Sequence, residues 1–462
     1  MRYIWKCVVV CWLNLLNYIL LLFKQKTNNP LVSHWLAGGL FFISAAFISF
    51  SVHAKEIKVK PGSGKLQAAI NSARKGDTLI LEPGIYSGSI NIDRSLTLLG
   101  SQDSIIDGEG TGHVVVISAA NVRVKGFTIQ HSGNNLNTED SAIFVTVKGD
   151  NARIENNYFK NNLIGVYLKG PKSAIVSDNI IIGSQFHRVN DRGNGVYLWN
   201  TPGSVIKNND IRYGRDGIFV NVSQNNIFDG NRLSDLRFAI HYMYTNNSEV
   251  KNNVSINNNV GYALMFSHHI VAKNNQSIGD NERGLFFNFT NYSTIEGNSV
   301  SGGTEKCVFI YNANFNAINN NSFADCDIGI HFTAGSESNK IYSNAFINNR
   351  TQVKYVGTRY IEWSNAGKGN YWSDNAAFDI DKNGIADQPY RPNDLVDQIV
   401  WRHPMAKLLL NSPSVQILKW AQSEFPGLHP GGVTDSVPLM LAPEINNVVN
   451  SKEKRKVELI NG

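Results

Sequence analysis

The sequence has 462 residues, of which 42% are hydrophobic and 17% are charged. This balance describes a folded protein and excludes an intrinsically disordered one. The formal net charge is +6, but four basic residues and no acidic residue precede residue 55, so the rest of the chain carries +2. Because lysine and arginine form no clustered stripe, we expect no nucleic-acid partner.

Residues 1–54 are interpreted as a targeting segment. The apolar run from Trp35 to Val52 ends in "VHA" before Lys55, which is the pattern of a secretory signal peptide with a small-residue cleavage site. An earlier apolar run, 4–23, leaves a second interpretation open, in which both runs stay in the membrane as a hairpin. We favour cleavage after Ala54, which predicts an exported protein.

Residues 55–77 predict a strand followed by a capping helix. The stretch "KLQAAINSARKGD" at 65–77 has the apolar spacing of a short amphipathic helix. A helix in front of a repeat covers the open end of the first coil, where strand edges would otherwise be exposed.

Residues 78–360 contain an internal repeat. An asparagine followed closely by an apolar residue recurs at intervals of 22, 30, 22, 22, 22, 23, 23 and 23 residues. These asparagines are Asn157, Asn179, Asn209, Asn231, Asn253, Asn275, Asn298, Asn321 and Asn344. The interval of 30 contains "SQFHRVND", which indicates an inserted loop. Such a period, with short strands between Gly and Asn, is typical of a right-handed parallel β-helix. We therefore predict an all-β fold of roughly a dozen coils, in which asparagine amides bond to the next coil.

A second motif gives the direction of the side chains. The stretches "GVYL", "GVYL", "GIFV" and "AIHY" begin at Gly165, Gly195, Gly217 and Ala239. Their second and fourth residues are aliphatic or aromatic and are expected to face the core, so the third and fifth residues face outward. The outward fifth residues are Lys169, Trp199, Asn221, Met243 and Met265.

Two of these outward residues are methionines in adjacent coils. His241 shares the outward face with Met243, and His268 and His269 follow Met265 closely. Thioether and imidazole without thiolate is a ligand set suited to Cu(I) in an exported protein. We favour a copper site at these five residues, although a protein-docking face and an unspecialised surface both remain open.

The outward aromatic row favours a face that is covered by a partner. Tyr167, Tyr197 and Phe219 occupy successive third positions, where a solvent-exposed wall would carry polar residues. Trp199 and Phe219 are therefore candidate docking residues.

The cysteines beyond the targeting segment, Cys307 and Cys326, do not share a repeat position. Export would permit a disulfide, but two cysteines make no framework. We expect them to be buried, small apolar groups.

Residues 361–442 predict a C-terminal cap and docking region. In "DIDKNGIAD", oxygen ligands at Asp379, Asp381, Asn383 and Asp387 follow the spacing of a calcium loop, although Tyr390 stands where the last glutamate belongs. Calcium and a plain acidic turn both remain open. The stretch 405–425 predicts two short helices split by a proline. Trp401 and Trp420 are candidate docking residues in this C-terminal region. Residues 443–462 are expected to be a disordered tail.

The sequence resembles the NosD family, the periplasmic copper-processing proteins of nitrous oxide reductase maturation. The resemblance rests on "FAIHYMYTNNSEV", "GYALMFSH", "GNYWSDNAAFDIDKNGIADQPYRPNDLVDQ" and "HPGGVTDSVPLM", among other blocks within 57–440. It implies a periplasmic β-helix joined to an ABC transporter, with NosY as membrane subunit and NosF as ATPase. It also implies copper transfer from the lipoprotein NosL toward nitrous oxide reductase, and association with the membrane through these partners.

One alternative class is a carbohydrate-active β-helix enzyme, such as a polyuronate lyase, hydrolase or epimerase, and another is a scaffold or adhesion β-helix. Carbohydrate-active enzymes of this kind need a groove with several carboxylates. Candidates here are Asp216 with Arg215, and Asp235 with Arg237, all at coil corners where turn and cap roles are commoner. We therefore favour a copper-binding protein that is not an enzyme.

Overall fold

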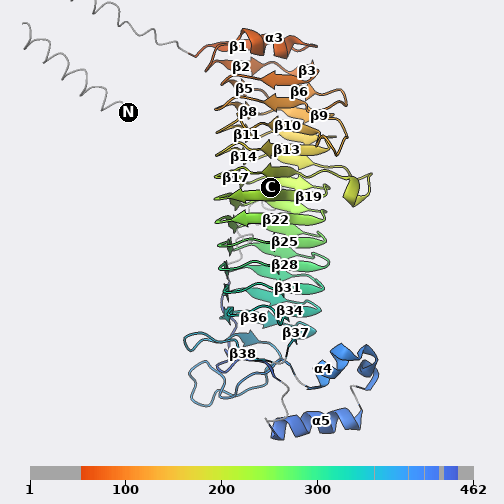
Figure 1. The fold of residues 1–462 in the computed structure, drawn as a ribbon, viewed down its shortest axis with the longest axis vertical. Coiled ribbons are helices and arrows are strands. Elements are labelled where there is room, and N and C mark those ends of the chain that lie inside the picture. The colour runs from red at the N-terminus through yellow and green to blue at the C-terminus, as the bar shows by residue number, and fades with distance from the viewer. Residues whose placement is uncertain (1–53, 358, 394, 410–411, 426–430, 446–462) are drawn as a thin grey trace, which may run out of the picture. The chain divides into compact units, whose positions relative to one another are not determined.

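The computed structural model describes residues 54–357, 359–393, 395–409, 412–425 and 431–445. Within them, three parallel sheets form the walls of a β-helix (Figure 1), two of 13 strands and one of 12. Each strand pairs with the corresponding strand of the next coil, so the predicted fold class is confirmed. The predicted targeting segment and nearly all of the predicted tail lie outside the described residues.

The three sheets are named here walls A, B and C. Wall A contains β1 (Glu56–Val59), β2 (Thr78–Leu81), β5 (Thr97–Leu99), β8 (Arg123–Lys125), β11 (Arg153–Glu155), β14 (Ile175–Ser177), β17 (Val205–Lys207), β20 (Ile227–Asp229), β23 (Glu249–Lys251), β26 (Val271–Lys273), β29 (Thr294–Glu296), β32 (Ala317–Asn319) and β35 (Lys340–Tyr342). Wall B contains β3 (Gly84–Ser87), β6 (Ser104–Asp107), β9 (Thr128–Gln130), β12 (Tyr158–Lys160), β15 (Ile180–Ile182), β18 (Asp210–Arg212), β21 (Arg232–Ser234), β24 (Val254–Ile256), β27 (Gln276–Ile278), β30 (Ser299–Ser301), β33 (Ser322–Ala324), β36 (Ala345–Ile347) and β39 (Tyr371–Trp372). Wall C contains β4 (Ile90–Ile92), β7 (Val115–Ile117), β10 (Ser141–Val145), β13 (Ile164–Lys169), β16 (Val196–Trp199), β19 (Asp216–Gln224), β22 (Phe238–Asn246), β25 (Val260–Met265), β28 (Arg283–Asn288), β31 (Lys306–Tyr311), β34 (Ile328–Thr333) and β37 (Thr351–Val356).

The N-terminal end is closed as predicted. Helix α3 (Lys65–Ser72) buries Leu66 and Ile70, and the side chain of Gln67 exchanges hydrogen bonds with the backbone of Asn91 at 2.7 and 3.2 Å. Strand β1 pairs with β2, so wall A begins one strand before residue 78. Strand β1 therefore covers the edge of β2, and α3 covers apolar residues at this end of the β-helix.

A ladder of buried asparagines joins the coils. From Asn157 to Asn344, each repeat asparagine donates its backbone N–H to the side-chain Oδ1 of the asparagine one coil further on, at 2.8–3.1 Å. The side-chain amides donate to backbone carbonyls, as Asn253 does to Phe228 at 3.0 Å. Because every polar atom has a partner, the amides can be buried. The predicted role of the asparagines is confirmed.

The C-terminal region closes the other end of the ladder. Asn370 donates its N–H to Asp435 Oδ2 at 2.6 Å, and the indole of Trp372 donates to the same oxygen at 2.9 Å. Trp363 and Trp372 are buried. The region also contains β38 (Tyr360–Glu362) paired with β40 (Gly432–Thr434), the helices α4 (Leu395–Arg402) and α5 (Pro413–Glu424), and the 3-10 helix η2 (Pro404–Leu409). A second 3-10 helix, η1 (Val189–Asp191), lies in the inserted loop of the β-helix. No described helix is both long and apolar enough to span a membrane.

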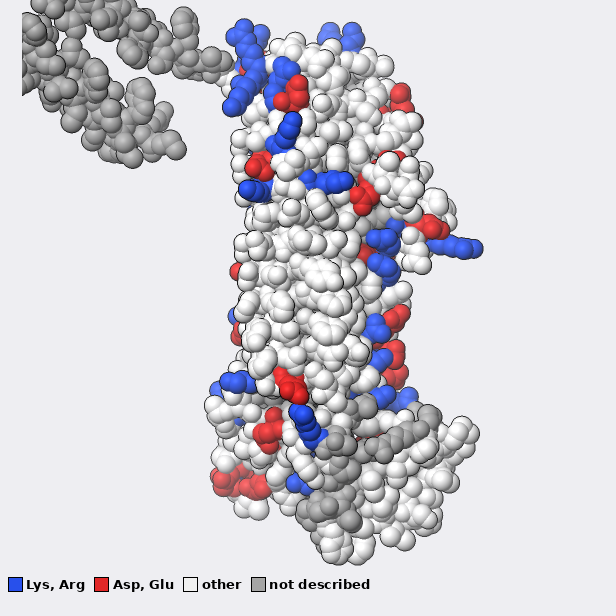
Figure 2. All heavy atoms as spheres, viewed as in Figure 1, with Lys and Arg blue, Asp and Glu red and all other residues white. Residues whose placement is uncertain are grey.

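One side of the β-helix has few charges. Figure 2 shows a broad band without Lys, Arg, Asp or Glu in the middle of the face on which β19, β22 and β25 are labelled in Figure 1. The sequence accounts for this band, since 217–228, 238–248 and 252–272 contain no charged residue. A partner that binds this band would therefore use apolar and polar contacts more than ion pairs.

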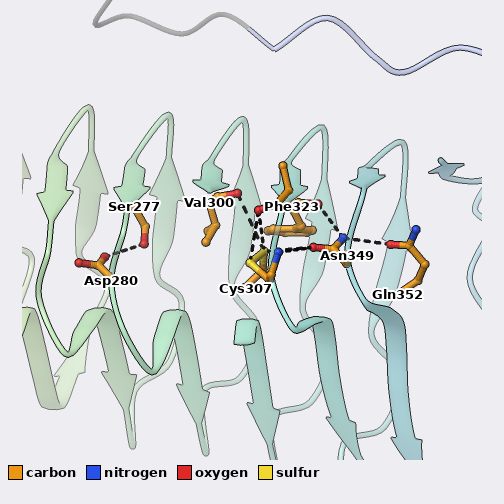
Figure 3. Close-up of a disulfide and its surroundings, with 9 residues drawn as sticks. Ser277, Asp280, Val300, Cys307, Phe323, Asn349 and Gln352 are labelled. Carbon is orange, nitrogen blue, oxygen red and sulfur yellow. Dashed lines mark hydrogen bonds between the residues drawn. A yellow bond between two sulfur atoms is a disulfide. The ribbon is translucent and has the colours of Figure 1, made fainter. Parts of the chain in front are cut away.

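The cysteine expectation was wrong. Cys307 and Cys326 form a disulfide inside the β-helix, with their Cα atoms 5.7 Å apart (Figure 3). Cys307 faces inward from β31, while Cys326 lies at the corner before β34, where its N–H donates to Asn349 Oδ1 at 3.0 Å. Because both side chains face the interior, residues at different repeat positions of neighbouring coils can meet there.

Candidate metal centre on wall C

The alternation predicted for β22 is present in the structure. Ile240 and Tyr242 are fully buried in the core, while His241 and Met243, which alternate with them, are partly exposed on the outer side of wall C. Met265, at the end of β25, is also partly exposed and packs against Ala263 and Phe286 in a small cluster outside the main core. These three of the five candidate ligands therefore face outward, as the sequence predicted.

The two methionines are direct neighbours. Met243 is the register partner of Met265 across β22 and β25, so their backbones lie ~4.8 Å apart. The same row continues with Asn221 on one side and Asn288 on the other. Three rotatable bonds in each methionine allow two thioethers at this spacing to converge on one ion.

His241 is held in place by a buried carboxylate. Its Nδ1 lies 3.0 Å from Asp216 Oδ2, and the ring packs between Phe219 and Phe238 at centroid distances of 4.9 and 4.6 Å. With Nδ1 engaged, Nε2 is the nitrogen left to bind a metal.

Asp216 also forms an ion pair that the sequence did not predict. Its two carboxylate oxygens accept hydrogen bonds from Arg237 at 2.8 and 2.7 Å. Burial alone would raise the pKa of Asp216, but the hydrogen bonds from His241 and Arg237 hold this pKa below its usual value. Arg237, which the sequence analysis considered beside Asp235, therefore binds Asp216 in the structure.

The other two candidate copper ligands lie further along the chain. His268 and His269 follow the turn at Phe266 and the buried Ser267. Both side chains are exposed, and the ring of His269 stacks on Tyr292 at 5.5 Å. The structure thus brings His241, Met243 and Met265 onto one wall and places His268 and His269 beyond its edge.

The candidate docking residues lie in two regions. On wall C, Phe219 stacks on Tyr197 at 5.0 Å and makes a tilted contact with His241 at 4.9 Å, and Trp199 is 39% exposed. In the C-terminal region, Trp401 in α4 is partly exposed and Trp420 in α5 is 62% exposed. Neither group is tested by these contacts, and both stay predictions.

The sequence reasoning missed an aromatic ridge beside the methionines. Tyr244 lies near the end of β22, and Phe266 and Phe289 directly follow β25 and β28. The three rings stack on one another at 5.2 and 5.3 Å. All three have φ between 49° and 54°, a left-handed conformation that is unusual for bulky residues. Asn200 and Asn312 take the same conformation at strand ends elsewhere on wall C. Aromatic residues where asparagine is expected were the signal that could have revealed the ridge.

The acidic loop folds around its own carboxylates. Asp379 accepts hydrogen bonds from the N–H groups of Asn383 and Gly384 at 3.1 and 2.9 Å, and Asp387 accepts from Ile380 at 2.8 Å. Asp381 accepts from the backbone and side chain of Asn383. Across the described residues, no three side chains of His, Cys, Asp or Glu are arranged to hold a metal ion. The calcium site stays a prediction.

The comparisons with known proteins agree first on the class. The surface protein and adhesin PfbA of Streptococcus pneumoniae shares the fold with a TM-score of 0.51 at 11% identity, covering 63% of this chain and 94% of that chain. At this identity the likeness concerns the fold alone. The chain is thus a parallel β-helix protein.

Sequence comparison then identifies the family. The family described as "Periplasmic copper-binding protein (NosD)" matches residues 177–377. A protein of Stutzerimonas stutzeri named "Probable ABC transporter binding protein NosD" is 40% identical over 82% of this chain and 92% of its own length. Its namesake in Pseudomonas aeruginosa is 42% identical over 79% and 88%. The chain belongs to the NosD family, and these relatives are named as binding proteins.

Proposed function

We propose that this protein is a periplasmic carrier that binds Cu(I) on wall C and works with an ABC transporter. It receives copper from a donor lipoprotein of the NosL type and delivers it to nitrous oxide reductase for assembly of the copper–sulfide cluster. The family description and the names of the relatives support the coarse role. The copper ligands, the direction of transfer and the individual partners are our proposal.

The observation that carries the proposal is the register pairing of Met243 and Met265 beside a held imidazole. Two thioethers and one neutral imidazole form a soft donor set, which favours monovalent copper over harder ions. A set without thiolate also avoids disulfide chemistry during export. Because the ligands are partly exposed, an incoming protein can reach the ion, so copper can be both accepted and released. His268 and His269 are proposed as auxiliary ligands during exchange.

Two surfaces support docking of partners. On wall C, Trp199 shares the register row of Asn221 and Met243, and Phe219 is the register partner of His241. These residues, with the uncharged segments 217–228 and 238–248, suit a copper-exchanging protein, and Figure 2 shows the band with few charges on this side. The C-terminal helices expose apolar residues, among them Leu408 at 80% and Ile417 at 64%, near Trp420 in sequence. Exposed apolar surface of this kind marks interaction sites. We assign it to the membrane subunit of the transporter, NosY, which is joined to the ATPase NosF.

The alternative, a carbohydrate-active enzyme, has less support. Its candidate acid Asp216 is fully buried and is bound by Arg237 and His241. Asp235 lies at a coil corner with φ 58°. A general acid or nucleophile must reach the substrate. The carboxylate of Asp216, which is buried under its contacts with Arg237 and His241, does not. Release of unsaturated sugars from a polyuronate by the purified protein would revive this alternative.

An anaerobic Cu(I) titration tests the proposal. The chain without residues 1–54 is titrated in competition with a chromogenic Cu(I) chelator, alongside a His241→Ala/Met243→Ala/Met265→Ala variant. We expect the variant to bind at least about 100-fold more weakly, since all three ligands are removed. His403→Ala/Met405→Ala removes an exposed methionine and a nearby histidine elsewhere and should bind as the wild type does. Equal affinity of the triple variant and the wild type would refute the site.

Partner docking is tested separately from copper binding. Wild-type protein is expected to co-purify from solubilised membranes with a permease and an ATPase. A Leu408→Asp/Ile417→Asp variant should lose this association while keeping its Cu(I) affinity. If the variant still co-purifies with the permease, the C-terminal helices are not the docking surface.

A further inference from the structure

A buried ionised carboxylate on the outer side of a β-helix wall is an unusual feature. Asp216 opens β19, its side chain is 0% exposed, and it accepts hydrogen bonds from Arg237 and His241. Removing a carboxylate from water costs several kcal/mol unless charged partners compensate. The residues paired with this position in the next three coils are Phe238, Val260 and Arg283. The fold thus accepts apolar and cationic residues here, so the repeat does not require an acid.

The contact between Asp216 and His241 decides which ring nitrogen of the imidazole carries the proton. Phe219 and Phe238 pack against the ring at centroid distances of 4.9 and 4.6 Å, and the side chain of His241 is 12% exposed. These aromatic contacts do not distinguish the two ring nitrogens. The hydrogen bond at 3.0 Å does, because Asp216 Oδ2 can accept only from a protonated Nδ1.

We propose that Asp216 is a positioning residue that presents Nε2 of His241 to the copper ion. By accepting the Nδ1–H bond, the carboxylate fixes the neutral imidazole in the tautomer whose Nε2 lone pair is free. It also makes that nitrogen a stronger donor, as outer carboxylates do for metal-bound histidines. Arg237 orients the carboxylate through its two remaining hydrogen bonds. This inference rests on the copper-binding function proposed above.

The chain offers a matched control for the loss of a carboxylate. Glu155 on wall A is bound by Arg123 at 2.6 Å and Arg153 at 2.7 Å, and its side chain is 9% exposed. It contacts arginines as Asp216 does, and both of these charged partners are arginines rather than a histidine. Glu155→Gln therefore reports what the loss of a largely buried ion pair does to the β-helix in general.

The first readout is the metal-free protein. With ¹⁵N-labelled histidine, long-range ¹H–¹⁵N correlation spectra distinguish the protonated from the free ring nitrogen, and His241→Gln assigns the signal. We expect a single tautomer with the proton on Nδ1 in the wild type and in Glu155→Gln. In Asp216→Asn, the two nitrogens of His241 should move toward averaged shifts. An unchanged His241 spectrum in Asp216→Asn would overturn the inference.

The second readout is Cu(I) affinity. Asp216→Asn should bind about 10–100-fold more weakly than the wild type, while Glu155→Gln should bind equally well. If Asp216→Asn does not fold, Asp216→Asn/Arg237→Gln replaces the ion pair by an amide pair and takes its place. Wild-type affinity in these variants, with loss in the His241, Met243 and Met265 triple variant, refutes the positioning role and leaves the copper site standing. Wild-type affinity in the triple variant refutes the copper site itself.

Discussion

Asp280→Asn should stabilise the protein at neutral pH. Asp280 is fully buried, and its carboxylate accepts hydrogen bonds from the hydroxyls of Ser255 and Ser277, both at 2.6 Å, and from the N–H of Asn258 at 2.8 Å (Figure 3 shows the Ser277 contact). Burial raises the pKa of Asp280 from 3.8 to about 6, against the opposing effect of these hydrogen bonds. The folded state therefore disfavours the ionised carboxyl.

The magnitude follows from this shift. A rise of about two pKa units corresponds to ~3 kcal/mol of unfolding free energy at 1.36 kcal/mol per unit. Because folding raises this pKa, the unfolding free energy is highest below pH 3.8, where the carboxyl is protonated in both states. The protein loses this part of its unfolding free energy as the pH rises through about 6. Asparagine avoids this loss, and it fits the position. In the preceding coil, Asn258 accepts from the N–H of Leu236 and donates to Ser255 in the corresponding geometry.

The assay is denaturant unfolding of the wild type and Asp280→Asn at pH 4 and pH 7.5. We expect the variant to gain up to ~3 kcal/mol at pH 7.5 and almost nothing at pH 4. Asn258→Asp places a carboxyl at the equivalent position one coil earlier and should show the opposite sign with the same pH dependence. A loss of stability in Asp280→Asn that is equal at both pH values would refute the reasoning, because the serine contacts would then outweigh the ionisation cost.

Three other expectations concern stability. Asn253→Ala should lower the unfolding free energy by about 3 kcal/mol, because buried partners of its side chain lose their hydrogen bonds. In the same denaturant titration, Asn259→Ala at an exposed position should change the unfolding free energy by less than about 0.5 kcal/mol. Cys307→Ala/Cys326→Ala should lower the unfolding free energy by about 3 kcal/mol, the value for a loop of 19 residues, and wild-type protein unfolded with a reductant should match it. Ca²⁺ should raise the melting temperature of the wild type but not of Asp379→Asn in a thermal shift assay, and an equal rise in both would contradict the calcium loop.

The repeat made one class of contact predictable. Side chains one repeat apart face the same way and lie one strand spacing apart, so counting residues was enough to pair Met243 with Met265. The same counting predicted the asparagine ladder from Asn157 to Asn344. Both predictions depend on the backbone geometry alone, which every coil shares.

Contacts between different repeat positions could not be predicted in this way. Cys307 and Cys326 meet because both face the interior from neighbouring coils. Asp216 on β19 contacts His241 on the neighbouring strand β22, although the register partner of Asp216 is Phe238. The two side chains span the distance between these positions. Asp435 binds Asn370 from 65 residues away in a region without the repeat. In each case the length and direction of the side chains decide the contact, and the repeat period of the sequence predicts neither.

Moving the methionine pair separates the two kinds of contact in the proposed copper site. Asn221→Met/Met265→Asn keeps a thioether pair at 221 and 243, since Asn221 is the register partner of Met243. Met243→Asn/Asn288→Met also keeps a pair, at 265 and 288, but it removes the thioether from the strand of His241. Both variants have the composition of the wild type.

If the ion needs both thioethers and the held imidazole, the first variant should bind Cu(I) within about tenfold of the wild type, and the second at least about 100-fold more weakly. Competition titrations measure both. Equal binding by the two variants would mean that any stacked pair of methionines suffices on this wall. The coil spacing alone would then create the site, and His241 with its carboxylate would have no part in it.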